Sequence, residues 1–281
     1  MEKALKISSG DVHYWTHGDP SKPTLVMIHG FTGDHYGFQK LIPLLEADYF
    51  IITPDLPGSG ISTLQPQSQW AIDPLAKLAN EFVANLQLEK PPIILGHSMG
   101  GLVVSSMVHQ APDLFANKVI LLSPVPTKIR WFDSRKIGAL MGEFQYFIGH
   151  KLPVVGPVII KSKWLTTLIA NILITTKHKP TVEFTHQQMQ NNLNFISSIK
   201  YYYMLTKDIN RRGSLDYATT LAQKDTLVIN GDIDRVVPLS ELEKLVKASG
   251  AQFTLIEGVG HDIHYEKPAE AAGVIKAFLT N

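Results

Sequence analysis

The chain contains no cysteine among its 281 residues. This absence excludes disulfide bonds, thiolate metal ligands and a cysteine nucleophile. It also means that cysteine content says nothing about whether the protein resides in an oxidising or a reducing compartment. Long apolar runs are also missing, since no uninterrupted stretch reaches the roughly 20 residues that span a bilayer. The first residues, 1–6, lack the apolar segment of a secretory signal. We therefore expect a soluble, cytoplasmic protein.

The net charge is only +1, but the charges are unevenly distributed along the chain. Residues 125–215 contain 13 Lys or Arg against 4 Asp or Glu, so the middle of the chain is basic and the remainder is acidic. The same segment is rich in large apolar side chains, among them Trp131, Phe132, Phe144 and Trp164. This combination predicts that the middle of the chain is a unit of its own.

Short apolar runs alternate with helical patterns on either side of the basic segment. Such runs are typical of parallel strands that are buried on both faces. The predicted strands are residues 25–28, 50–52, 93–95, 119–122, 227–229 and 253–256. The predicted helices are residues 38–45, 73–86, 99–109, 239–248 and 269–279. In the second helix, Asp73 is expected at the N-cap and Pro74 at the first helical position.

The order of these elements predicts an α/β fold, with a mostly parallel, doubly wound sheet covered by helices on both faces. Residues 125–215 interrupt the alternation with helix-like pieces that several prolines and a glycine separate. We predict a helical insertion there. The core would then consist of a first part at residues 1–124 and a second part at residues 216–281.

Residues 96–100 read Gly-His-Ser-Met-Gly and directly follow a predicted strand. The pattern is typical of a sharp turn between a strand and a helix, with Ser98 at its tip. Glycines are needed on both sides because a Cβ would clash with the neighbouring strand and helix. Helix N-terminal N–H groups would lie near the hydroxyl and could receive developing negative charge. Ser98 is therefore the candidate nucleophile.

Other chemically active residues follow the remaining predicted strands. In doubly wound sheets, reactive groups collect at the carboxyl ends of the strands. His29, Asp55, Asp234 and His261 each follow such a run, as does Asp232. A serine, an acid and a histidine thus occur in that order along the chain, each at the end of a strand.

Together these motifs resemble the α/β-hydrolase family, in particular members with a helical cap inserted after the strand that follows the helix next to the nucleophile. The resemblance rests on residues 29–30, 55–60, 96–101, 231–238 and 260–261, and it is weak within the cap. It implies the α/β-hydrolase fold with Ser98 as nucleophile, His261 as general base and Asp234 as the acid. It also implies an oxyanion hole formed by the backbone N–H groups of Phe31 and Met99.

The chemistry gives each of these residues a role. A serine hydroxyl is a poor nucleophile at neutral pH, so it requires a base such as His261, which Asp234 would orient. Asp232 is the competing acid and is otherwise expected to organise its loop. His261 and His264 form a His-x-x-His pair, but no third ligand stands nearby in sequence. We therefore expect no metal, and we expect His264 at the rim of the site.

We expect a serine hydrolase that cleaves a carboxylic ester with an apolar acyl group through an acyl-serine intermediate, without metal or organic cofactor. The alternative is hydrolysis of a carbon–carbon bond in a vinylogous diketone, because such enzymes resemble this chain in cap position and reactive residues. A ligand-binding protein that keeps the fold without catalysis is a third hypothesis. Haloalkane dehalogenases and epoxide hydrolases are disfavoured, because the resembling members carry aspartate at the position of Ser98.

The expected partner is a small-molecule ester or another acyl substrate. Nucleic acid is not expected, since the basic segment carries no recognition motif and the remainder of the chain is acidic. Four lysines flank the apolar residues 164–174, namely Lys161, Lys163, Lys177 and Lys179. This arrangement raises the hypothesis of a transient contact between the cap and an anionic lipid surface. A solvated cationic face is the alternative.

Overall fold

The structure is a computed structural model, and it describes residues 1–130, 135–152 and 154–280. An eight-stranded sheet has the order β1-β2-β4-β3-β5-β6-β7-β8. The first two strands form an antiparallel hairpin, β2 is antiparallel to β4, and the other neighbours are parallel. The strands are β1 (Glu2–Ile7), β2 (Gly10–His17), β3 (Thr24–Ile28), β4 (Phe50–Pro54), β5 (Ile93–His97), β6 (Lys118–Leu122), β7 (Asp225–Gly231) and β8 (Gln252–Ile256).

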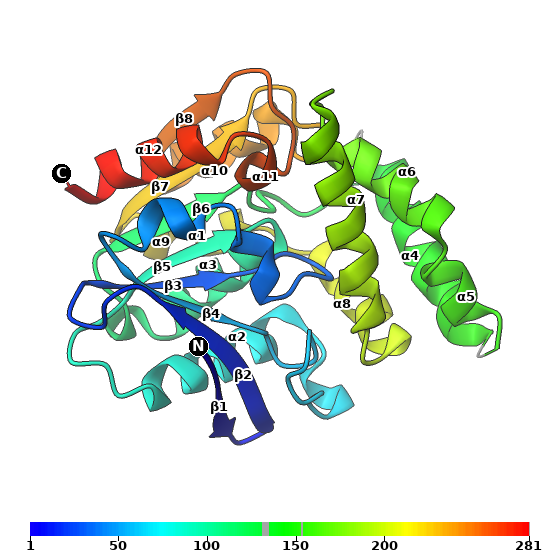
Figure 1. Cartoon of the computed structure of the whole chain (residues 1–281), viewed down its shortest axis with the longest axis horizontal. Coiled ribbons are helices and arrows are strands. Elements are labelled where there is room, and N and C mark those ends of the chain that lie inside the picture. Colours follow the sequence, from blue (N-terminus) through cyan, green and yellow to red (C-terminus); the bar gives the residue numbers. More distant parts are fainter. Residues whose placement is uncertain (131–134, 153, 281) are drawn as a thin grey trace.

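Helices cover both faces of this sheet (Figure 1), and the predicted α/β, mostly parallel, doubly wound architecture is confirmed. The helices of the sheet domain are α1 (Ile42–Leu45), α2 (Ile72–Asn85), α3 (Met99–Gln110), α9 (Ala218–Leu221), α10 (Leu239–Ser249), α11 (Ile263–Glu266) and α12 (Pro268–Thr280). Between β6 and β7 the chain forms α4 (Lys136–Lys151), α5 (Gly156–Ile160), α6 (Lys163–Leu173), α7 (Lys179–Asn194) and α8 (Ile199–Ile209).

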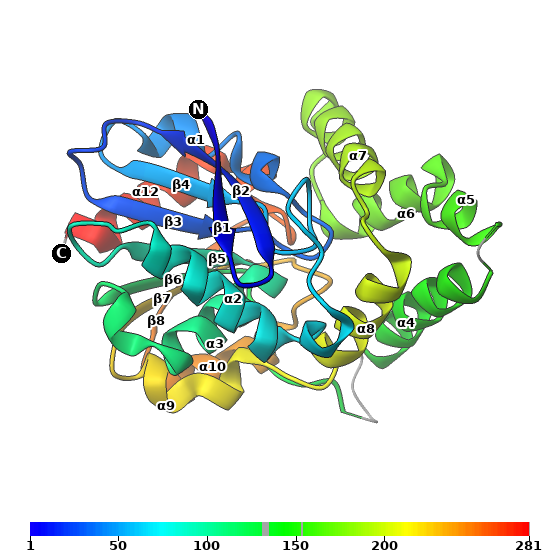
Figure 2. The same ribbon diagram turned by 90° about the horizontal axis from the view of Figure 1, so that it is seen from below.

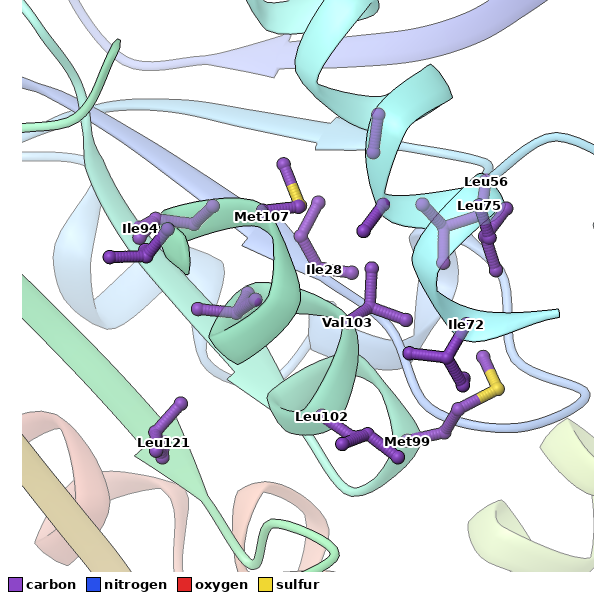
Figure 3. Packing of buried hydrophobic residues seen from close by; sticks show 14 of the residues in the cluster. Ile28, Leu56, Ile72, Leu75, Ile94, Met99, Leu102, Val103, Met107 and Leu121 are labelled. Atoms are coloured by element: carbon purple, nitrogen blue, oxygen red, sulfur yellow. The ribbon is translucent and has the colours of Figure 1, made fainter. Parts of the chain in front are cut away.

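Alternate residues of the central strands supply two separate cores. In β3, Val26 and Ile28 face one core, while Leu25 and Met27 face the other. The first core packs against α2, α3 and α10, and the second packs against α1 and α12. Figure 3 shows Ile28 in the first core, with side chains of α3 around it. Because both faces are buried, the strand is apolar throughout, which is why its position could be predicted.

Helices α4 to α8 form a layer beyond the end of the sheet, the cap. In Figure 1, α7 and α8 lie nearer the sheet, and α4, α5 and α6 lie on their outer side. Figure 2 shows α5 and α6 again at the end of the molecule that is furthest from the strands. No helix in the described part of the chain combines the length and the apolar character needed to cross a membrane. Trp131, Phe132 and Pro153 lie outside the described residues.

The N-terminal hairpin of β1 and β2 was not among the predicted strands. Its residues are mostly exposed or half-buried, and only Ile7 and Val12 are buried. A hairpin at the edge of a sheet needs few apolar residues, because one of its faces remains in water. It therefore lacks the apolar run by which the other six strands could be predicted.

The helix predicted over residues 38–45 is largely wrong. The structure has a 3-10 turn at His35–Phe38, and α1 spans only Ile42–Leu45. Pro43 stands in the first turn of α1. A proline lacks the N–H that an α-helix needs in its interior, so a helix cannot run through this position from residue 38.

The predicted N-cap of α2 is also wrong, because the helix begins at Ile72 and Asp73 lies in its first turn. The amide of Ile72 instead donates to Oδ2 of Asp208, at 2.8 Å, from the end of α8. Asp73 accepts a hydrogen bond from Ser106 and forms an ion pair with Arg212, at 2.6 Å. The cap and the sheet domain are thus joined at this helix terminus by residues that are far apart in sequence.

Candidate active site

Ser98 lies between the last residue of β5 and the first residue of α3. Its backbone has φ 53° and ψ −119°, a conformation that a residue with a Cβ rarely adopts. Two hydrogen bonds hold the turn, since its amide donates to Leu122 at 2.9 Å and its carbonyl accepts from Gly101 at 2.9 Å. The side chain is presented beyond the end of the strand, as the sequence motif predicts.

The glycines of the motif are required by close approaches of the backbone. A Cβ on Gly96 would lie 2.3 Å from the carbonyl oxygen of Gly100. A Cβ on Gly100 would lie 2.3 Å from the carbonyl oxygen of Ile28, in β3. Neither contact can be relieved by turning a side chain, because the opposing atoms belong to the backbone. The turn therefore requires glycine at both positions.

A chain of hydrogen bonds connects Ser98, His261 and Asp234. Nε2 of His261 lies 2.9 Å from Oγ of Ser98, and Nδ1 lies 2.8 Å from Oδ2 of Asp234. The side chains of His261 and Asp234 are buried, whereas Ser98 remains partly exposed. An ionised carboxylate can only accept, so Nδ1 carries a proton and Nε2 is left to accept the proton of the hydroxyl. This geometry suits a serine activated by a histidine.

Asp234 is held in this position by the loop that follows β7. Its Oδ1 accepts hydrogen bonds from the amides of Val236, at 2.7 Å, and Val237, at 3.0 Å. Asp232, the competing acid, accepts from Gly258 at 2.7 Å instead. The structure therefore brings Asp234 to His261 and leaves Asp232 to organise the turn after β8.

The ionisation of the pair follows from burial and from the contact between the two side chains. Burial alone lowers the pKa of His261, but the charge and the hydrogen bond of Asp234 outweigh burial, so the pKa is raised above 6.5. Burial would raise the pKa of Asp234, yet the charge of His261 and the bonds from His261, Val237 and Val236 lower it. Asp234 is thus favoured as a carboxylate beside His261.

The amides of Phe31 and Met99 are available on the loop and helix that adjoin Ser98. A Cβ on Gly30 would lie 3.3 Å from Cβ of Ser98, so the segment that leads to Phe31 runs directly beside the serine. Met99 is the first residue of α3, where helical N–H groups lack a partner within the helix. Among the described residues, neither amide donates to an acceptor. Both are candidates to bind an oxyanion.

Comparison with known proteins identifies the family of the chain. The sequence profile of a family described as alpha/beta hydrolase fold matches residues 23–268. The chain belongs to the α/β-hydrolase family. One relative of this α/β-hydrolase is the uncharacterized hydrolase YugF of Bacillus subtilis, 28% identical over 283 residues, which cover 99% of this chain and 97% of that protein.

Two solved structures share the fold of this α/β-hydrolase. The esterase EaEST of Exiguobacterium antarcticum superposes with a TM-score of 0.80 and 20% identity, covering 100% of both chains. The 2-hydroxy-6-oxo-6-phenylhexa-2,4-dienoate hydrolase of Rhodococcus sp. strain RHA1 has a TM-score of 0.80 and 21% identity, covering 100% of this chain and 99% of that one. At these identities the likeness shows the fold.

Two tyrosines of the cap contact the α/β-hydrolase core beside the candidate oxyanion hole. The ring of Phe31 meets Tyr146 of α4 edge to face, with centroids 5.5 Å apart, and Tyr202 of α8 at 5.4 Å. Burial raises the pKa of Tyr202 to about 12, so its phenol stays neutral. Of the adjacent tyrosines, Tyr201 is also buried, whereas Tyr203 is half-buried. Sequence reasoning did not identify this aromatic group, because its members come from three distant segments.

Glu266 is a further residue that sequence reasoning missed. One carboxylate oxygen accepts from the amide of Gly260, at 3.1 Å, directly before His261. The other accepts from the amides of Thr175, at 2.9 Å, and Thr176, at 2.6 Å, just after α6. The side chain therefore joins the histidine loop of the α/β-hydrolase core, residues 257–262 between β8 and α11, to the cap. Its place five residues after His261 was the only signal in the sequence.

His264 is buried, so its predicted position at the rim of the site is wrong. Its ring packs 4.2 Å from that of His97, and its Nδ1 has no hydrogen-bond partner among the described residues. Burial lowers the pKa of His264 to about 3 and raises that of Asp262, beside it, to about 6. The chain turns these side chains inward because α11 begins immediately after the histidine loop.

His97, Asp262 and His264 are the group within the described residues that could hold a metal ion. Their ligand atoms lie within 4.8 Å of one another. Two imidazoles and a carboxylate are a ligand set that zinc accepts. In the structure Nε2 of His97 also lies 3.3 Å from the carbonyl oxygen of His261, so the group adjoins the histidine loop of the α/β-hydrolase. His29 is not part of this group. Its Nε2 accepts a hydrogen bond from the amide of Leu56 at 3.1 Å, so His29 holds the loop after β4.

Proposed function

We propose that this α/β-hydrolase cleaves carboxylic esters that have an apolar acyl group, through an acyl intermediate on Ser98. The observation that carries the proposal is the continuous hydrogen-bond chain from Asp234 through His261 to Ser98. Each residue type suits one role in acyl transfer, and the two distances lie within hydrogen-bond reach before any substrate is bound.

In the first step, Nε2 of His261 takes the proton of the Ser98 hydroxyl as Oγ attacks the carbonyl carbon of the ester. The carbonyl oxygen becomes an oxyanion and accepts hydrogen bonds from the amides of Phe31 and Met99. Each such donor contributes about 3–4 kcal/mol to the stability of the transition state. Asp234 remains ionised and stabilises the imidazolium that forms.

In the second step, His261 returns the proton to the departing alcohol, and the acyl group stays on Ser98. A water molecule then gives a proton to His261 and attacks the acyl carbon. Collapse of the second tetrahedral intermediate releases the carboxylic acid, and the proton on His261 returns to Oγ of Ser98. The cycle requires no other group, so the proposal includes neither metal nor organic cofactor.

The preference for an apolar acyl group rests on the surroundings of Phe31. Its half-buried ring packs on the buried rings of Tyr146 and Tyr202, and the three form an aromatic wall, accessible at Phe31, beside the amide that is proposed to bind the oxyanion. The phenols of both tyrosines are neutral because burial raises their pKa values. An apolar acyl chain can replace water against such a wall at little cost, whereas a charged one would lose its hydration.

The proposal is tested with p-nitrophenyl esters of increasing acyl length and with labelling by a fluorophosphonate. We expect ester hydrolysis that Ser98→Ala lowers by about 10⁴-fold or more. We also expect a mass increase on the peptide that contains Ser98. Failure of the folded protein both to turn over esters and to react with the fluorophosphonate would contradict the proposal and favour a ligand-binding role.

The alternative of carbon–carbon bond hydrolysis is tested in the same series. A vinylogous diketone would be attacked or hydrated with the same residues, and the fold also occurs in the dienoate hydrolase named above. We expect the esters to be the better substrates. Activity that is confined to the diketone and abolished by Ser98→Ala would replace the ester proposal with this one.

A further inference from the structure

Helix α6 exposes three of its six large apolar residues and buries two small ones. Trp164, Leu168 and Ile172 are spaced four residues apart and form one stripe along the helix, and Trp164 is 74% exposed. The opposite side, with Thr166 and Ala170, is buried. An ordinary surface helix has the reverse arrangement, with its apolar stripe toward the core. The sequence of α6 is therefore suited to an apolar partner outside the chain.

Helices α4 and α5 continue this surface. In α4, Met141, Phe144 and Phe147 follow helical spacing and are exposed, with Phe144 at 64%. In α5, Val158 is exposed at 70%. Helix α5 packs against both α4 and α6, and the three helices lie in the outer part of the cap, away from the sheet (Figure 1). Of the large apolar residues that are exposed in the described chain, most belong to the cap. Exposed apolar residues gathered on neighbouring helices in this way mark a site of interaction.

Cationic side chains border the apolar stripes. Between Glu143 and Glu183 the chain has five lysines and no acidic residue. All five are exposed: Lys151, Lys161 and Lys163 stand at the ends of α4, α5 and α6, Lys177 lies in the loop after α6, and Lys179 begins α7 and forms an ion pair with Glu183. Within the described residues, Lys161, Lys163 and Lys177 form no ion pair, and the carboxylate of Glu143 accepts from Asn210, directly after α8. The surface thus combines exposed apolar residues with unneutralised positive charge.

We propose that the outer face of α4, α5 and α6 docks on an anionic phospholipid surface. The apolar stripes would enter the boundary between headgroups and acyl chains, with Trp164 at the headgroup level, where its indole suits both environments. The lysines would contact the headgroup phosphates. Apolar stripes bordered by lysines match an anionic bilayer in both polarity and charge, whereas a second copy of this basic face would repel it.

This docking would bring the candidate active site to the lipid. Helix α6 ends at Leu173, whose carbonyl accepts from the amide of His261 at 2.8 Å. The aromatic wall at Phe31 is formed in part by Tyr146, which belongs to the same α4 that exposes Met141 and Phe144. Substrates of the docked protein would then include esters that reside in or partition into a membrane. This statement about substrates rests on the proposed function. The docking itself does not depend on catalysis.

The test is sedimentation of the Ser98→Ala protein with vesicles of phosphatidylcholine, with or without one-third phosphatidylglycerol. We expect binding to the anionic vesicles, weaker binding to the neutral ones, and loss of binding as salt is raised. Lys161→Glu/Lys163→Glu is expected to weaken binding by about tenfold or more. Trp164→Ala is expected to weaken it at every salt concentration, because it removes apolar burial.

A matched control changes the same charge elsewhere. Lys22 and Lys90 are exposed and lie in the loops before β3 and β5, at the opposite end of the strands from the cap. Lys22→Glu/Lys90→Glu is expected to retain most of the binding. Circular dichroism and light scattering show whether each variant is folded and monomeric.

Three outcomes would overturn the inference. One is the absence of binding to anionic vesicles, and another is an equal loss of binding in the control variant. The third is a stable dimer in solution that Trp164→Ala converts to a monomer, since the face would then be an interface between two copies. Hydrolysis of water-soluble esters, measured with Ser98 retained, tests the proposed function separately, and the surface substitutions should leave that activity unchanged.

Discussion

The backbone amide of His261 donates to the carbonyl oxygen of Leu173 over 2.8 Å, across the boundary between the sheet domain and the cap. Leu173 is the last residue of α6, and the carboxylate of Glu266 joins the same two segments through Gly260 and Thr175. The position of the proposed base therefore depends on where the cap segment lies. A change in the cap can alter the distance between His261 and Ser98 without touching either side chain.

The first prediction concerns Glu266. Glu266→Ala removes the acceptor for three backbone amides and should reduce the free energy of unfolding by about 1–3 kcal/mol. Because the histidine loop loses its attachment to the cap, we expect kcat to fall by about 10- to 100-fold with a smaller change in KM. Steady-state kinetics with a p-nitrophenyl ester and chemical denaturation measure the two effects.

Two further variants separate positioning from a general loss of stability. Glu266→Gln keeps one acceptor oxygen and should recover part of kcat. Glu270→Ala removes an exposed glutamate that forms an ion pair with Lys267, and it should leave kcat unchanged. If Glu266→Ala lost stability but kept its full kcat, the attachment would be structural only.

The second prediction concerns the pH dependence of hydrolysis. His261 must be neutral to accept the proton of Ser98, and Asp234 raises its pKa, so kcat/KM should increase with pH through a value above 6.5. In Asp234→Asn the charge is gone and burial then lowers the pKa. The acid limb should move below pH 6.5, while kcat falls by about 10⁴-fold because the tautomer is no longer held. Profiles of kcat/KM from mildly acidic to mildly alkaline pH test both shifts.

Asp232→Asn is the control for that experiment. Its carboxylate accepts from Gly258 and does not contact His261, so the acid limb should stay where it is in the unmodified protein. A shift of the limb in Asp232→Asn and none in Asp234→Asn would exchange the roles that we assign to the two aspartates.

The third prediction concerns the backbone approach of α3 to β3. Gly100→Ala places a Cβ 2.3 Å from the carbonyl oxygen of Ile28, so the helix and the strand must separate. We expect a loss of about 3 kcal/mol or more in the free energy of unfolding, together with loss of esterase activity. Thermal unfolding followed by circular dichroism gives the first quantity.

Gly273→Ala is the matched control, because it makes the same substitution at a helical glycine that has open space around it. No atom lies within 4 Å of the added Cβ, and Gly273 is in the interior of α12. Alanine should stabilise the protein by about 0.5–1 kcal/mol, because it restricts the unfolded chain more than glycine does. Equal destabilisation by both substitutions would argue against a specific close approach at Gly100.

The residues that could be predicted from sequence are those that local rules determine. The strand β5 is apolar because both faces are buried, and the turn at Ser98 has glycines at fixed spacing, so both could be inferred without coordinates. The sequence did not separate Asp232 from Asp234 by geometry, because a shift of two residues in a loop changes no local pattern. The structure places only Asp234 within hydrogen-bond distance of His261.

The features that could not be predicted depend on contacts between distant segments. Asp208, near the end of α8, accepts the hydrogen bond from the amide of Ile72 at the start of α2. Sequence reasoning could not see this contact and assigned the N-cap position of α2 to Asp73. His264 is buried because α11 places its ring against those of Phe38 and His97, which a His-x-x-His pattern does not reveal. The outward direction of Trp164 likewise depends on how α6 packs on α7, since a helical stripe of apolar residues usually faces a core.

The fourth prediction concerns Asp34, a buried carboxyl group close to Asp55. Burial, with the charge of Asp55 as a smaller cause, raises the pKa of Asp34 from 3.8 to about 6. Between these two pH values the folded protein binds more protons than the unfolded chain, so the free energy of unfolding decreases as pH rises through this interval. Above it, the ionised group remains a cost to the fold of about 2–3 kcal/mol.

Asp34→Asn should therefore stabilise the protein at pH 8 and have little effect at pH 4. The asparagine can keep the acceptor oxygen that binds the amide of Tyr36 at 2.9 Å, and it removes the charge. We expect a gain of about 2 kcal/mol in the free energy of unfolding at the higher pH, measured by urea denaturation at both values. Asp113→Asn, at an exposed position, should show no such difference between the two pH values. A gain of equal size at pH 4 would mean that the substitution acts through packing, because at that pH the carboxyl group of the unmodified fold is already neutral.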